Sequence, residues 1–69
     1  MAINPKKFGK LVGEHRIARN LSKQQLADTI GVHVNAVELF EAGTTLPMEV
    51  TRAKIAKALG VRPEDLEGG

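Results

Sequence analysis

The sequence predicts a small all-α domain. Three observations support this: its composition, the spacing of its apolar residues, and residues that suit the ends of short helices. Ala, Leu, Lys, Glu and Gln dominate the chain, and no alternation of period two exceeds a few residues. Apolar side chains recur instead at helical spacing, as Phe8, Leu11 and Val12 do. Residues suited to ending short helices follow at intervals: Asn20, Gly31, Gly43 and Gly60.

Length and composition set the bounds of this prediction. With 69 residues, 42% of them hydrophobic and 26% charged, the chain is expected to form a single folded domain over residues 1–69. The absence of cysteine excludes a disulfide framework and a thiolate zinc site. No apolar run approaches the roughly 20 residues of a membrane span, and the first residues lack a signal-peptide pattern. The expected compartment is therefore the cytoplasm, with no membrane partner.

Each expected helix has its own start and stop signals. Asn4 and Pro5 suit the cap and first position of a helix over about 5–19, which Asn20 ends in a left-handed conformation. Ser22 and Gln25 form a capping box for a second helix, which Gly31 stops. Its buried stripe is Leu26, Ala27 and Ile30.

The second half of the chain predicts three further helices. One begins near 33–35 and runs to 42, unless a capping box between Asn35 and Glu38 starts it a turn later. Pro47 is expected to open the next, which ends before Gly60. A short fifth helix is expected over 62–66.

Charge is distributed unevenly along the chain. The net charge is only +2, but residues 1–23 carry six Lys and Arg against a single acid, Glu14. Residues 24–50 carry four acids and no Lys or Arg. This asymmetry indicates one side that faces a polyanion, although a solvated helix face would give the same pattern.

The residues around Gly31 predict a helix-turn-helix over about 22–42. Such a pair needs a small residue where the helices cross, a residue tolerant of positive φ in the turn, and apolar anchors in the second helix. Ala27, Gly31, Val37 and Phe40 meet these needs in order.

At this point the sequence resembles the lambdoid phage repressor and Cro family, the Xre-type helix-turn-helix domain. The resemblance runs from about Phe8 to Leu66 and rests on FGKLVGEHRIARNLSKQQLADTIGV, VNAVELFEAG and IAKALGVRPEDL. It implies a compact five-helix domain that binds double-stranded DNA, with its third helix in the major groove. It also implies a homodimer on two operator half-sites. Whether that dimer would use the region of Leu46, Val61 and Leu66 stays open.

The resemblance assigns base contacts to the start and outer face of the third helix. The family's base-reading positions fall on Val34, Asn35 and Leu39, flanked by His33 and Glu38. Asn35 suits adenine, Val34 and Leu39 suit a thymine methyl, and Glu38 suits cytosine. Alternatively, Asn35 serves only as a cap, and the two apolar residues pack within the protein or against another one.

Phosphate contacts are expected from side chains around this helix: Lys10, Arg16, Ser22, Lys23, Thr44 and Thr45. Lys23 would act with the N-terminus of the second helix, which attracts anions. Arg16 matches a family position that pairs with the position of Glu41. The chain departs from many members in having Thr44 and Thr45 where they have Lys or Arg, so the N-terminal lysines would have to compensate.

Enzymatic function is not expected. The chain has one serine, which is committed to a cap, two distant histidines and no Gly-rich phosphate loop, so we predict no cofactor and no metal. We expect a sequence-specific DNA-binding regulator, a repressor or Cro-like protein. The alternative is a protein-interaction module on the same fold, such as an antitoxin, coactivator or scaffold domain.

Overall fold

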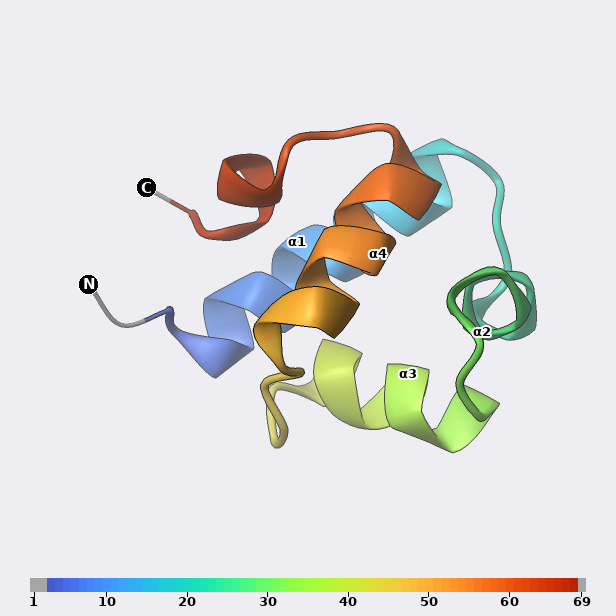
Figure 1. Ribbon diagram of the computed structural model, residues 1–69, viewed down its shortest axis with the longest axis horizontal. Helices are drawn as coiled ribbons and strands as arrows, with labels where there is room; N and C mark the ends of the chain where they lie inside the picture. Colours follow the sequence, from blue (N-terminus) through green and yellow to red (C-terminus); the bar gives the residue numbers. More distant parts are fainter. Residues whose placement is uncertain (1–2, 69) are drawn as a thin grey trace.

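A computed structural model describes residues 3–68 as four α-helices followed by one 3-10 turn (Figure 1). Positions 1, 2 and 69 of the predicted domain lie outside the described residues. The elements are α1 (Pro5–Ala18), α2 (Lys23–Ile30), α3 (Val34–Ala42), α4 (Glu49–Leu59) and η1 (Pro63–Leu66). Over the described range the all-α prediction is confirmed, and no helix there is long and apolar enough to cross a bilayer.

The predicted number of five helices is wrong, because the last element is a single 3-10 turn. The element Pro63–Leu66 is only four residues long, which is too few for repeated α-helical hydrogen bonds. The predicted start of α4 is also wrong. Pro47 is buried in the loop, and its carbonyl accepts a 2.6 Å hydrogen bond from Arg52 Nη1. The helix therefore begins two residues later, at Glu49.

The other helix boundaries follow the local signals. Asn4 Oδ1 accepts from the backbone N–H groups of Lys6 and Lys7, and Asn20 adopts a φ of 56°. Gly31 ends α2 with a φ of 75°. The third helix begins at Val34, so the alternative start one turn later is wrong.

All four helices and η1 contribute to one core. Its fully covered side chains include Phe8 from α1, Leu26 from α2, and Ile55 and Leu59 from α4. Leu66 of η1 is 0% exposed, which fastens the end of the chain onto α1 and α4. Leu66 is therefore part of the monomer core and offers no surface to a second chain.

The contact between α1 and α3 is unusually close. A methyl group on Gly9 would lie 2.2 Å from the Phe40 carbonyl oxygen, and one on Gly13 would lie 3.2 Å from Glu41 Oε1. Gly9 and Gly13 are four residues apart and share one side of α1. They let the backbone of α1 lie directly against the C-terminal end of α3, which fixes where α3 sits.

Candidate nucleic-acid interface

The region from α2 to α3 is a helix-turn-helix, two short helices joined by a three-residue turn. Ala27 of α2 is 0% exposed, and Val37 and Phe40 hold α3 in the core. Gly31 lies in the left-handed region, and no atom stands within 4 Å of where its Cβ would be. This glycine is therefore required by backbone conformation and not by space.

The opposite face of α3 gathers the residues predicted to contact bases. Residues 34, 35, 38 and 39 lie on one side of a helix by spacing. Asn35, Glu38 and Leu39 are exposed, Leu39 to 49%, while Val34 is half-buried. The apolar Leu39 side chain has no hydrogen-bonding atom, and neither the Asn35 nor the Glu38 side chain hydrogen bonds to another part of the chain described by the structure. The face therefore offers an amide, a carboxylate and apolar surface to an incoming partner.

His33 caps this helix with its ring. Nδ1 accepts a 3.0 Å hydrogen bond from the backbone N–H of Asn35. An accepting Nδ1 carries no proton, so the neutral ring carries its proton on Nε2. That N–H is free to donate to an acceptor in front of α3.

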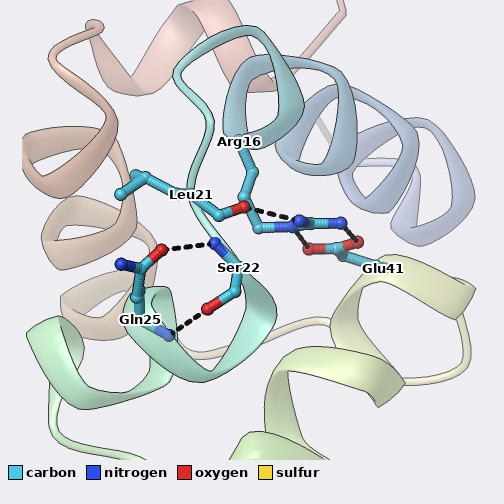
Figure 2. Close-up of polar contacts among 5 residues, drawn as sticks. All are labelled: Arg16, Leu21, Ser22, Gln25 and Glu41. Atoms are coloured by element: carbon cyan, nitrogen blue, oxygen red, sulfur yellow. Dashed lines mark hydrogen bonds and ion pairs between the residues drawn. The ribbon is translucent and has the colours of Figure 1, made fainter.

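The N-terminus of α2 presents hydrogen-bond donors that remain available to an acceptor outside the protein. Ser22 Oγ accepts from Gln25 N at 3.0 Å, and Gln25 Oε1 accepts from Ser22 N at 2.7 Å (Figure 2). This reciprocal pair satisfies two amides. Between residues 3 and 68 no group accepts from the N–H groups of Lys23 and Gln24. Those two N–H groups, the Ser22 hydroxyl proton and the Lys23 ammonium suit a phosphate.

Arg16 ties the end of α3 to the segment that leads into α2. Its Nε and Nη2 donate to the two Glu41 carboxylate oxygens at 2.7 and 3.1 Å, and its Nη1 donates to the Leu21 carbonyl at 2.8 Å (Figure 2). The pairing expected between Arg16 and Glu41 is thus present, and the two side chains are only 11% and 12% exposed. One guanidinium holds the end of α3 against the segment that leads into α2. It has little surface left for a phosphate.

The remaining phosphate candidates lie near the C-terminal end of α3. Thr44 and Thr45 are exposed, and Thr44 Oγ1 donates to the Leu39 carbonyl at 3.2 Å. Lys6 packs beside this loop, since a Cβ on Gly43 would lie 2.7 Å from Lys6 Cα. Lys10 is exposed one turn further along α1.

Sequence reasoning missed the two glycines of α1 and the packing of Lys6. The available signal was the spacing of Gly9 and Gly13, because small residues four apart mark a close helix approach. Within residues 3–68 the structure shows no group of three or more potential metal ligands.

Comparison with known proteins identifies the fold and the family. The helix-turn-helix family HTH_3 matches residues 12–66, which include α2, α3 and every predicted contact residue except Lys10. The chain belongs to this family of DNA-binding helix-turn-helix regulators. No curated protein sequence matches it.

This helix-turn-helix domain is similar to solved structures of several bacterial regulators. The restriction-modification controller protein C.AhdI from Aeromonas hydrophila is 34% identical over 88% of this chain and 92% of that one, with a TM-score of 0.84. The clp gene regulator ClgR from Corynebacterium glutamicum is 18% identical, covers 94% of this chain and 69% of that one, and gives a TM-score of 0.89. An HTH_3 family transcriptional regulator from Vibrio cholerae is 24% identical, with 91% and 35% covered and a TM-score of 0.83.

Proposed function

We propose that this helix-turn-helix domain is a sequence-specific DNA-binding transcription regulator of the repressor or Cro-like type. The observation that carries the proposal is the outer face of α3, where exposed side chains of the family's reading positions lie free of internal hydrogen bonds. An α-helix fits the major groove, where each base pair presents a distinct pattern of donors and acceptors. Bacterial DNA lies in the cytoplasm, where we expect the protein to act.

Base reading on this proposal comes from α3. Asn35 donates to and accepts from an adenine, Glu38 accepts from a cytosine amine, and Leu39 and Val34 pack on thymine methyl groups. The His33 Nε2–H donates to a phosphate or a base acceptor beside the helix start, because the cap occupies its Nδ1.

Phosphate contacts flank that helix on both sides. Ser22 and Lys23 take one phosphate at the N-terminus of α2, and Thr44, Thr45 and Lys10 take others near the end of α3. The buried ion pair favours Arg16 as the residue that sets the spacing between these two anchors. Two copies on half-sites about 34 Å apart would then exclude RNA polymerase or a competing regulator.

A second function is favoured by the apolar and acidic character of the same face. Leu39 is 49% exposed, and the recognition helix carries no Lys or Arg. A protein-interaction module, such as an antitoxin, coactivator or scaffold domain, would use this surface to bind a protein instead of DNA.

A binding selection from random duplex DNA, followed by a salt titration on the recovered sequence, decides between the two functions. The regulator predicts a recovered palindromic motif and an affinity that falls steeply with salt. Absence of binding even at low salt favours the interaction module. Recovery of single, non-palindromic half-sites would count against the dimer.

In the same salt titration, Lys23→Ala tests the predicted phosphate contact of Lys23. Losing one phosphate contact should weaken binding to all sequences alike and reduce the slope of log affinity against log salt by about 0.9. Arg62→Ala is the control, because Arg62 is exposed just before η1 and its guanidinium pairs with Asp65. An equal slope change in both variants would remove Lys23 from the interface.

A further inference from the structure

We propose that the outer face of α3 requires DNA whose adenine and cytosine amines are unmethylated at the bases that it contacts. Methylation of such an amine, at adenine N6 or cytosine N4, then releases the protein from its site. This inference rests on the proposed function, because it concerns which chemical form of DNA the same face accepts. It is carried by the polar groups that α3 presents, and Glu38 is the deciding residue.

Glu38 is an exposed acid without a partner inside the protein. Within residues 3–68 the ion pairs are those of Glu41 and Asp65, and the Glu38 carboxylate accepts no hydrogen bond there. An ionised carboxylate can accept hydrogen bonds but cannot donate them. When this face meets DNA, Glu38 therefore needs a donor from the DNA.

The major groove supplies only two kinds of base donor. These are the N4 amine of cytosine and the N6 amine of adenine, whereas guanine and thymine present acceptors there. The phosphates that border the groove are negative, so Glu38 would weaken binding if no amine were in contact with it. Lys and Arg are the side chains best suited to the acceptors of guanine, and α3 contains neither. The chemistry of this helix therefore selects for base amines.

Asn35 adds a second dependence on a base amine. It lies three residues before Glu38 on the same side of α3. Its backbone N–H is held by His33 Nδ1 at 3.0 Å, while its side-chain amide is exposed and makes no hydrogen bond within the described residues. In a bidentate pair with adenine, the amide oxygen accepts the N6 hydrogen and the amide nitrogen donates to N7. Two neighbouring side chains thus use the same kind of donor.

Methylation removes the hydrogen that these contacts need. Each base amine has two hydrogens, of which one serves Watson–Crick pairing and the other points into the major groove. A methyl group that leaves the base pair intact replaces the hydrogen in the groove. The facing carboxylate or amide oxygen then loses its donor and is held out of water beside an apolar group, which costs more than the hydrogen bond itself contributed.

A methyl group at cytosine C5 has a different effect, because it leaves both amine hydrogens in place. It occupies the same position in the groove as the methyl group of thymine. Val34, one turn before Glu38, and Leu39, which follows it, offer apolar surface to such a group. The face therefore discriminates by where the methyl group is attached and not by its presence alone.

Synthetic duplexes of the sequence recovered by the binding selection test the inference. Each carries one modified base: N6-methyladenine, N4-methylcytosine or 5-methylcytosine. We expect at least one methylated amine within the sequence to weaken wild-type binding about tenfold or more in a competition assay. At the same cytosine, 5-methylcytosine should bind within about twofold of cytosine or more tightly. A methylated amine outside the recovered sequence is the control for altered duplex stability and should have no effect.

Glu38→Ala assigns the effect to this side chain. For one modified amine, the ratio of unmethylated to methylated affinity should fall close to one in this variant. The ratio is the measured quantity, because removal of the acid also relieves repulsion from phosphates and shifts the affinity for all duplexes. Glu64→Ala is the matched control, since it removes an exposed acid of η1 and should keep the full ratio.

Three results would overturn the inference: amine methylation tolerated throughout the recovered sequence, equal losses from N4-methylcytosine and 5-methylcytosine at every cytosine, or a Glu38→Ala variant that keeps every wild-type ratio. Each of them requires a recovered sequence that the protein binds, so each leaves the proposed regulator standing. A selection that recovers no sequence would overturn the regulator and this inference together.

Discussion

The two faces of α3 differ in how many contacts they make with the rest of the protein. The inner face meets α1 at Gly9 with no room for a methyl group, and its Glu41 is locked by Arg16. The outer face carries the Asn35 and Glu38 side chains, which are exposed and make no hydrogen bond to the other residues described. One helix thus combines a surface fixed by many contacts with a surface that makes almost none.

This difference separates stability from recognition. A side chain that the fold does not use can be exchanged without loss of structure. On the proposed function, outer-face residues could therefore vary with the DNA sequence. The inner contacts keep such changes from moving the helix. Substitutions on the inner face should therefore lower the free energy of unfolding, and those on the outer face should change binding alone.

Arg16→Ala should have the largest effect. It leaves Glu41 nearly buried and unpaired and removes the donor to the Leu21 carbonyl, at a cost of about 3 kcal/mol in free energy of unfolding. Thermal and urea unfolding followed by circular dichroism measure this loss. Replacing the pair together, as Arg16→Met with Glu41→Leu, should recover most of it. A double variant as unstable as Arg16→Ala would show that the Leu21 contact carries the effect.

Gly9→Ala should follow, at about 2–3 kcal/mol. The added methyl would overlap the Phe40 and Glu41 carbonyl oxygens, which are backbone atoms and cannot turn aside. Gly31→Ala is the control, since its Cβ meets no atom and only the left-handed φ of 75° is strained. It should cost about 1 kcal/mol. Equal losses in urea unfolding would mean that the α1–α3 contact can relax.

The features that the sequence predicted correctly are those that depend on interactions between residues close together in the chain. The caps at Asn4 and Ser22 and the left-handed ends at Asn20 and Gly31 each follow from local hydrogen bonds and backbone conformation. The outer face of α3 could be anticipated because residues 34, 35, 38 and 39 share a side once the helix start is known. Its contacts with DNA stay a prediction.

The misses involve contacts that form only when the chain is folded and that local residue patterns do not reveal. Pro47 reads as a helix start, but the burial of Pro47 and the bond from Arg52 keep it in the loop. The closeness of Gly9 to Phe40 joins residues 31 positions apart, and no local pattern determines that distance.

Asn35→Ala tests the outer face. The free energy of unfolding should stay within about 0.5 kcal/mol of wild type, because the side chain makes no internal hydrogen bond. Discrimination at one base pair should fall by about 1–3 kcal/mol, measured by competition among single-base variants of the selected sequence. Unchanged discrimination would place the reading residues elsewhere, and lost stability would contradict the division between the two faces.

The smallest effect is expected at η1, where a scaffold contact is exposed. The backbone N–H of Arg62 donates to Asp65 Oδ2 at 3.0 Å and, with the Arg62 guanidinium, lowers the pKa of Asp65 below its ordinary value. A lowered pKa stabilises the fold at pH values above the ordinary one, and this contribution disappears as pH falls through the lowered value. Wild type should therefore melt slightly above Asp65→Asn near neutral pH, with the gap closing in acid. A difference in melting temperature that persists in acid would show that the charge of Asp65 is not its source. A destabilisation as large as that of Arg16→Ala would show that burial does not set the strength of these contacts.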